Sequence, residues 1–246
     1  MVKLLQKPLT NDKINLIFFP FAGGSGEYYH HWLAKLAPNI SGQYAQLPGR
    51  GRYFEQPAYG ELPKLCQHLA AEISLYPNSE IAFFGHSMGA LIAFELAKML
   101  QEEYELTTRH LFLSGHRAPS EPYQRALLHK LNEEQLVEQM RHMGGIDNQL
   151  GLEDLKPFLP TLYQDFRLCE TYQHSEHVKL ASSMHILYGE QDEWINKETL
   201  EKWQLESHQK IIYHPFPGNH FYLTDRVNEI TRLINHTLGG TDVNCK

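Results

Sequence analysis

The sequence is poor in several features that would place it in other classes of protein. It has only three cysteines in 246 residues, Cys66, Cys169 and Cys245, and they lie far apart. An odd number of widely spaced thiols fits free cysteines in a reducing compartment better than a disulfide framework. Lysine and arginine number 22 against 29 aspartates and glutamates, which gives a net charge of −7. Such a chain has no global basic surface to attract nucleic acid or an anionic membrane.

Long hydrophobic runs are also missing. The longest, at residues 14–22 and 81–84, are far too short to span a bilayer. The N-terminal segment has no apolar core followed by a small-residue cleavage site, so no secretory signal is expected. Histidine is abundant, but no tight metal-ligand spacing occurs, and the adjacent His30 and His31 would point about 100° apart on a helix. We expect a cytoplasmic monomer that needs neither metal nor cofactor.

Short β-rich runs alternate with longer amphipathic ones, as in folds whose helices surround a parallel sheet. The first run is apolar throughout, which is typical of a strand covered on both faces. Strands are expected at residues 14–20, 43–47, 81–84, 110–114, 185–188 and 210–215. Helices are expected at residues 28–36, 61–75, 88–101, 198–204 and 227–236.

The alternation stops between the fourth and fifth predicted strands. Asn132 is expected to cap a helix that runs to Met143, and residues 155–169 have a second helical spacing. We interpret residues 117–178 as a helical lid inserted into a single domain of residues 1–246. The alternative is that these helices only cover the sheet.

The segment Gly85-His86-Ser87-Met88-Gly89 has the Gly-x-Ser-x-Gly pattern and lies between an apolar strand and an amphipathic helix. A sharp turn of this kind strains the serine and exposes its hydroxyl, and the flanking glycines avoid collisions across the turn. The positive end of the helix faces the reacting centre, where the N–H of Met88 can donate to an oxyanion. The pattern predicts Ser87 as a nucleophile, and a purely structural turn is the alternative.

A serine nucleophile needs a histidine to take its proton and a carboxylate to orient that histidine. In α/β-hydrolase folds the acid and then the histidine follow the serine, each in a loop after a strand. The histidines beyond the predicted lid are His185, His208, His214, His220 and His236. Only His220 lies in the loop after the last predicted strand. We predict it as the base, and a solvated surface histidine is the alternative.

The acid is expected in the turn after the strand at residues 185–188, where Glu190, Asp192 and Glu193 compete. Asp192 is favoured by its place a few residues past the strand and by its short side chain, which holds an imidazole rigidly. Both glutamates stay open as alternatives. The glycine-rich loop at residues 21–26 is expected to supply a second oxyanion N–H. A phosphate-binding loop is excluded there, because the Lys-Ser/Thr ending and a full dinucleotide fingerprint are missing.

Together these motifs closely resemble the type II, or external, thioesterases that accompany nonribosomal peptide and polyketide synthases. Generic esterases do not share the Gln-Leu-Pro-Gly-Arg-Gly segment or the Gly-Gly of the predicted lid. One departure is Tyr53, where the family often has an arginine. The matching segments are residues 19–25, 46–52, 85–90, 143–145, 159–160 with 165–166, 188–189 with 192, and 218–221.

The resemblance implies an α/β-hydrolase fold, with a mainly parallel sheet flanked by helices and an inserted, mobile lid. It implies hydrolysis of acyl thioesters on the phosphopantetheine arms of carrier proteins, which clears stalled or misprimed chains. It also implies that the backbone N–H groups of Ala22 and Met88 form the oxyanion hole. Catalysis by Ser87, His220 and Asp192 would then need no cofactor.

Docking of an acidic carrier protein on this acidic chain would need a local basic patch. The candidates are Arg50, Arg52, Arg117 and Arg125, although ordinary solvated arginines are the alternative for each. Other functions also stay open. A medium-chain acyl carrier protein hydrolase of fatty-acid synthesis belongs to the same group, and an esterase or acyltransferase would use the same machinery. A binding protein that has lost its chemistry is disfavoured by the intact catalytic set.

Overall fold

The computed structural model describes residues 2–174 and 178–239, and the strands in these ranges form one six-stranded sheet. Their spatial order is β2-β1-β3-β4-β5-β6, and each neighbouring pair is parallel, so the predicted parallel sheet is confirmed. The strands are β1 (Ile14–Phe19), β2 (Ile40–Tyr44), β3 (Ile81–His86), β4 (His110–Ser114), β5 (Ser183–Gly189) and β6 (Ile212–Phe216).

The order of the strands reverses between β1 and β3. From β1 the chain moves outward to the edge strand β2, and it then returns to place β3 on the other side of β1. At such a reversal a parallel sheet opens a crevice beyond the carboxyl ends of its strands. The loops that follow β1 and β3 meet at this crevice, and they contain the glycine-rich segment and Ser87.

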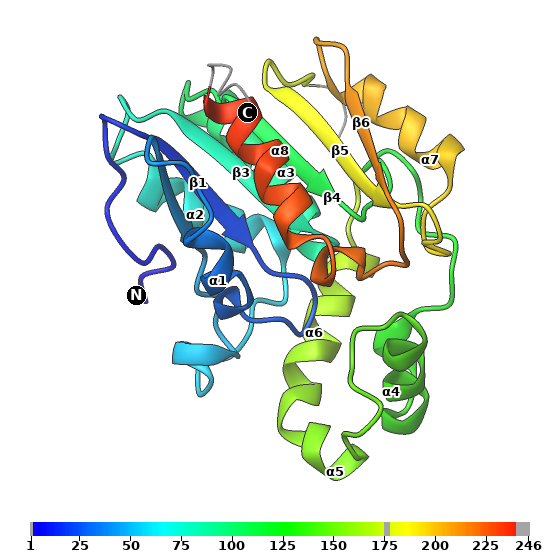
Figure 1. Cartoon of the computed structure of the whole chain (residues 1–246). Coiled ribbons are helices and arrows are strands. Elements are labelled where there is room, and N and C mark those ends of the chain that lie inside the picture. The colour runs from blue at the N-terminus through cyan, green and yellow to red at the C-terminus, as the bar shows by residue number, and fades with distance from the viewer. Residues whose placement is uncertain (1, 175–177, 240–246) are drawn as a thin grey trace.

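Helices cover both faces of the sheet (Figure 1). One face packs against α2 (Leu62–Ile73) and α3 (Met88–Glu103), and the other packs against α1 (His30–Leu33) and α8 (Val227–Gly239). All residues of β1 and β3 are therefore buried, as the apolar run at residues 14–20 predicts. The other elements outside the β4–β5 connection are α7 (Lys197–Glu201) and the 3-10 turns η1 (Gly26–Tyr29), η2 (Gly51–Tyr53), η5 (Lys202–Glu206) and η6 (Tyr222–Thr224).

Between β4 and β5 the chain leaves the sheet and forms α4 (Glu133–His142), α5 (Leu152–Leu155) and α6 (Leu159–Glu170). These helices lie beyond the carboxyl ends of the strands (Figure 1). Asn132 caps α4 as the sequence predicts, because its side chain accepts the backbone N–H of Gln135 in a reciprocal capping box. Two further 3-10 turns, η3 (Leu128–Lys130) and η4 (Lys156–Phe158), precede α4 and α6.

Two elements differ from the sequence prediction. The second strand lies at Ile40–Tyr44 instead of residues 43–47, and the helix expected at 28–36 is reduced to η1 and the single turn of α1. Pairing with β1 sets the register of β2, since Ile14 lies opposite Ile40 and Phe18 lies opposite Tyr44. A short edge strand with a weak local pattern is decided by such tertiary contacts. The other predicted elements occur within a few residues of their expected bounds.

Within the described ranges, no helix combines the length and hydropathy that a transmembrane span requires. Cys66 is buried, and both Cys66 and Cys169 are free thiols, as the sequence predicts. Cys245 lies outside the described residues.

Candidate active site

Ser87 occupies a strained turn between β3 and α3. Its backbone has φ +53° and ψ −116°, a conformation that non-glycine residues rarely adopt. The turn closes only because its neighbours lack side chains. A Cβ on Gly85 would lie 1.9 Å from the carbonyl oxygen of Gly89, and a Cβ on Gly89 would lie 2.2 Å from that of Phe19. The glycines of the motif are therefore required by the backbone packing around the serine.

Two backbone N–H groups beside Ser87 have no acceptor among the residues described. Met88 is the first residue of α3, where no helical carbonyl can accept its N–H. Ala22 lies in the turn after β1, and the next two amides of the turn are engaged: Gly24 donates to the oxygen of Phe21 at 2.9 Å, and Gly23 donates to Asp165 at 2.8 Å. Free donors at the positive end of a helix suit an oxyanion hole.

His220 and Asp192 form a buried pair beyond the ends of β5 and β6. Nδ1 of His220 lies 2.7 Å from Oδ2 of Asp192, and the two side chains are 5% and 0% exposed. The other oxygen of Asp192 accepts the N–H of Trp194 at 2.8 Å. Since a carboxylate only accepts, Nδ1 carries the proton and Nε2 is left as the basic nitrogen. This Nε2 is buried and has no hydrogen-bond partner within the described ranges.

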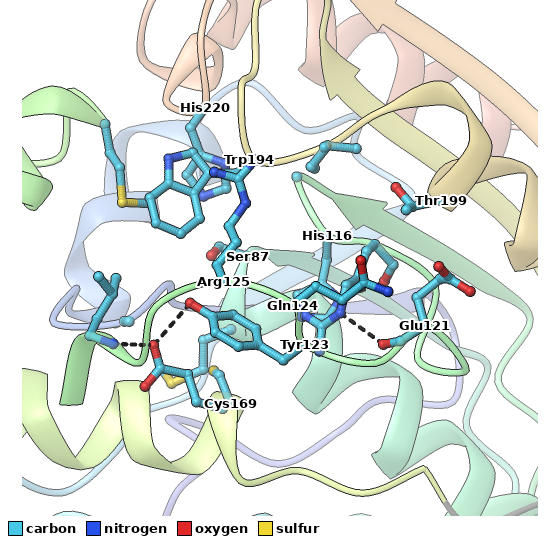
Figure 2. Close-up of a pocket in the computed structure, with 18 of the residues that line it drawn as sticks. Ser87, His116, Glu121, Tyr123, Gln124, Arg125, Cys169, Trp194, Thr199 and His220 are labelled. Carbon is cyan, nitrogen blue, oxygen red and sulfur yellow. Dashed lines mark hydrogen bonds between the residues drawn. The ribbon is translucent and has the colours of Figure 1, made fainter. Parts of the chain in front are cut away.

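The residues predicted for the catalytic site lie around one cavity of about 400 Å³. Ser87, His220, Ala22 and Met88 all line it, and Asp192 lies directly behind the imidazole. Figure 2 shows Ser87 and His220 together at its wall. No hydrogen bond joins Ser87 Oγ to His220 Nε2 in the described structure. In enzymes without bound substrate, catalytic hydrogen bonds are often long or poorly aligned, and they shorten when substrate binds.

The competing acids and histidines make other contacts. Glu190 is exposed, and Glu193 forms a surface ion pair with His142 at 3.1 Å. His185 and His214 lie within β5 and β6, where Nδ1 of His185 is 3.1 Å from Nε2 of His214. Glu193 lines the cavity beside Ser87, as His220 does. Glu190, His185 and His214 do not line it.

Two buried histidines near His220 were not singled out by the sequence. The ring of His86 lies 5.0 Å from that of His220, and its Nδ1 contacts Ser114 Oγ at 2.8 Å. Burial, followed by the nearby His220 and His116, lowers the pKa of His86 well below its usual value. Burial likewise lowers the pKa of His116 to about 3. Both rings are neutral at physiological pH. His116 follows β4 at the carboxyl edge of the sheet, and that position is the signal that could have identified it.

Arg50 is not a surface residue, so its assignment as a candidate for docking is wrong. It is 7% exposed and makes two hydrogen bonds to the carboxylate of Asp165, at 2.6 and 2.7 Å. The same carboxylate accepts the N–H of Gly23, and Arg50 also donates to the carbonyl of Gly24 at 3.2 Å. This ion pair ties α6 to the loop that carries Ala22. Arg50 can be buried here because the carboxylate of Asp165 neutralises its charge and accepts its hydrogen bonds.

The other three arginines differ in exposure. Arg52 and Arg125 are exposed and stay candidates for a docking surface, whereas Arg117 is half-buried and lines the cavity. In the part of the chain that the structure describes, no group of three or more histidine, cysteine, aspartate or glutamate side chains is arranged to hold a metal ion.

Comparison with known proteins agrees with this geometry. A family model described as a thioesterase domain matches residues 14–238. The chain belongs to the thioesterase family. The thioesterase PikA5 of Streptomyces venezuelae is 31% identical over 234 residues, which cover 94% of this chain and 83% of PikA5. A protein named linear gramicidin dehydrogenase LgrE, of Brevibacillus parabrevis, is 34% identical over 241 residues, covering 96% and 92% of the two chains.

Solved structures show to which group of thioesterases the chain belongs. The type II thioesterase BorB from the borrelidin biosynthetic cluster superposes with a TM-score of 0.87 at 29% identity, covering 96% of this chain and 97% of BorB. The chain is thus a type II thioesterase with the α/β-hydrolase fold, and the family resemblance drawn from its motifs is confirmed. A solved serine-to-alanine mutant of the type II thioesterase YbtT, 25% identical with a TM-score of 0.83, covering 96% and 97% of the chains, agrees with a serine nucleophile in this family.

The fatty-acid branch of the family is also represented. A medium-chain S-acyl fatty acid synthase thioesterase of Rattus norvegicus is 30% identical over 234 residues, covering 92% of this chain and 87% of that protein. It is more distant than PikA5.

Proposed function

We propose that this thioesterase releases acyl groups from the phosphopantetheine arms of carrier proteins in a nonribosomal peptide or polyketide pathway. Ser87 acts as nucleophile, His220 as base and Asp192 as the acid that orients His220. The observation that carries this proposal is the 2.7 Å contact between His220 and Asp192, at the cavity that holds the strained Ser87. The type II thioesterase YbtT, which comes from the yersiniabactin NRPS/PKS biosynthetic pathway, supports the substrate class.

The first half of the reaction acylates the enzyme. Nε2 of His220 takes the proton of the Ser87 hydroxyl as its oxygen attacks the thioester carbonyl. The negative oxygen of the tetrahedral intermediate accepts the N–H groups of Ala22 and Met88. The carbon–sulfur bond then breaks, and the pantetheine sulfur leaves with the proton held by His220. An acyl ester on Ser87 remains.

The second half releases the acid. A water molecule enters the cavity and gives one proton to Nε2 of His220 while its oxygen bonds to the acyl carbon. The same two N–H groups hold the new oxyanion, the ester bond to Ser87 breaks, and His220 returns the proton to the serine oxygen. Throughout, Asp192 accepts Nδ1–H and stabilises the imidazolium form of His220.

We assign residues 117–178, of which 175–177 lie outside the described residues, to a lid over the cavity, within a single domain that acts as a monomer in the cytoplasm. Several side chains from this segment line the cavity, including Leu128, Met143 and Phe166. Because Asp165 holds α6 to the catalytic loop, α6 is the fixed side of the lid. Movement that admits the pantetheine arm would then involve α4 and α5.

The test is hydrolysis of a panel of acyl-loaded carrier proteins, with the matched oxygen esters as a second series. We expect free acid from the thioesters, slower turnover of the oxygen esters, and no transfer of the acyl group to added alcohols or amines. Ser87→Ala is the matched control and should lose activity by a factor of about 10⁴ or more. Equal turnover by this variant, or hydrolysis of oxygen esters alone, would contradict the proposal.

A second candidate is the release of medium-chain acyl groups in fatty-acid synthesis, and the relative from Rattus norvegicus favours it. The same panel separates the two functions when it includes saturated chains of increasing length on acyl carrier protein. A sharp optimum at medium-chain saturated acyl groups supports the fatty-acid role. Broad turnover of short, aminoacyl or oxygenated groups supports the editing role.

A further inference from the structure

The cavity beside Ser87 contains a half-buried arginine that the proposed reaction does not use. Nε of Arg117 donates to the carbonyl oxygen of Glu121 at 2.9 Å, and the guanidinium carbon lies 5.3 Å from the centre of the Tyr123 ring. Its two terminal nitrogens make no hydrogen bond and no ion pair with the residues described. Burial lowers the pKa of this guanidinium, so water does not solvate it fully.

The acids nearest to Arg117 have other partners. The carboxylate of Glu121 pairs with Lys202. Glu170, which also lines the cavity, accepts the N–H groups of Leu128 and His129 at 2.7 and 3.1 Å and the hydroxyl of Tyr123 at 3.0 Å. The ring of His129 also contacts it. Neither carboxylate forms a hydrogen bond or ion pair with the Arg117 guanidinium, and the Glu121 carboxylate acts on it only through its charge.

Arg125 lines the same cavity but lies in a different environment. It is exposed, its guanidinium lies 4.6 Å from the centre of the Trp194 ring, and it donates to the carbonyl of Glu193. Its charge is therefore solvated at the rim. Figure 2 shows Arg125 beside Trp194, whereas Tyr123, the ring that Arg117 contacts, lies apart from them in the cavity lining.

A half-buried guanidinium with unused donors gains stability when a ligand in the cavity supplies acceptors. Its planar pair of N–H groups fits an oxygen acceptor, and a carboxylate best of all. Apolar side chains such as Leu128, Phe166 and Ile195 line the same space and suit the hydrocarbon part of an acyl chain.

We propose that Arg117 binds an oxygen atom on the acyl chain of the substrate, so that the enzyme selects oxygenated acyl groups over purely hydrocarbon ones. This inference rests on the proposed role of the cavity as the acyl site. A ketone and a carboxylate share the required chemistry. The oxygen must lie at the position along the chain that reaches the guanidinium from Ser87.

The experiment compares pantetheine thioesters of similar length: hexanoyl, 4-oxohexanoyl, 5-oxohexanoyl and glutaryl. In the wild type, kcat/KM for at least one oxygenated substrate should exceed that for hexanoyl by tenfold or more, since a site built to hydrogen-bond discriminates strongly against a chain that lacks the acceptor. Arg117→Met should reduce this ratio by a factor of about ten. Arg117→Lys should retain preference for glutaryl better than preference for the ketones, because it keeps the charge but loses the paired donors.

Arg125→Met is the matched control, since it makes the same change in the same cavity and should leave the ratio near its wild-type value. Turnover of hexanoyl thioester by each variant shows that the variant is folded. A wild-type enzyme that treats all four substrates alike would overturn the inference, as would Arg117→Met variants that preserve the ratio. Absence of any thioester hydrolysis by the wild type would instead refute the proposed function, so the two failures are distinct.

Discussion

At the scale of single residues, the cavity combines a strained backbone turn at Ser87 with a buried, unpaired nitrogen of His220. Ser87 and Glu105 are the non-glycine residues with positive φ in the described ranges, and Ser87 is the one at the cavity wall. Nε2 of His220 is buried and has no hydrogen-bond partner in the part of the chain that the structure describes. Unsatisfied groups and strain cost stability and persist where function requires them. Their coincidence with free N–H groups is the physical basis for assigning the reaction to this place.

Asp192→Asn tests the assignment of the orienting acid. An asparagine keeps the shape of the side chain but favours the wrong tautomer of His220, so kcat should fall by about 10⁴-fold with little change in KM. Glu193→Gln makes the same change one residue away, where the carboxyl group is exposed, and should alter kcat by less than about threefold. Steady-state kinetics on an acyl pantetheine thioester measures both. A larger loss in the Glu193 variant would transfer the acid role to that residue.

At the scale of secondary-structure elements, α6 supports the catalytic loop from outside the sheet. Asp165 lies on this helix, and its carboxylate binds both Arg50 and the N–H of Gly23, next to Ala22. The pair is buried on both sides, with side chains 7% and 3% exposed. Helix α6 thus fixes the loop that carries Ala22, the proposed oxyanion donor. The motif Gln-Leu-Pro-Gly-Arg-Gly marks Arg50 in the sequence, but its partner lies more than a hundred residues away.

Asp165→Asn should therefore affect both stability and catalysis. Loss of the buried charge leaves Arg50 uncompensated, so the free energy of unfolding should fall by about 3 kcal/mol. Looser placement of Ala22 should lower kcat by about 10–100-fold with a smaller change in KM. Urea denaturation and steady-state kinetics measure the two effects.

Glu72→Gln is the control for that change, because Glu72 also accepts backbone N–H groups, from Leu4 and Leu5, away from the cavity. It should leave kcat unchanged. The double variant Arg50→Met with Asp165→Leu should recover stability without recovering kcat, because Gly23 still lacks its acceptor. Wild-type kcat in a folded Asp165 variant would contradict the positioning role.

At the scale of the whole molecule, buried neutral histidines couple stability to pH. His116 and His185 are 7% and 4% exposed, and burial is the main cause that lowers the pKa of each to about 3. In the unfolded chain both would titrate near 6.5. Between about pH 6.5 and pH 3 the unfolded state therefore binds more protons than the folded state. Stability is fully present above pH 6.5 and is lost as the pH falls through this window.

His185→Phe isolates one of these groups. The ring of His185 stacks on Phe112 with ring centres 4.9 Å apart and contacts His214, and its buried Nε2 has no hydrogen-bond partner among the described residues. Phenylalanine keeps the ring but cannot bind a proton. Between pH 6.5 and pH 4.5 the variant should lose up to about 2.7 kcal/mol less of its unfolding free energy than the wild type loses. Denaturant titrations at several pH values measure this, and parallel pH profiles for the two proteins would contradict it.

Most of the fold could be predicted from the sequence, because apolar runs and amphipathic periodicity indicate which residues are buried. The runs at β1 and β3 are unambiguous, whereas β2 is a short edge strand whose register depends on β1. The site followed from topology, since strand ends meet at one edge of a parallel sheet. Pairings between distant side chains had no local signal. Thus the burial of Arg50 and the open guanidinium of Arg117 required the structure.

The measurement that bears most directly on the central claim is mass spectrometry of the enzyme quenched during turnover of an acyl-loaded carrier protein. The account predicts an acyl group bound covalently to the peptide that contains Ser87, and the same peptide labelled by a fluorophosphonate. Ser87→Ala should show neither adduct and should lose turnover by a factor of about 10⁴ or more. An adduct on another residue, or wild-type turnover by Ser87→Ala, would contradict the account.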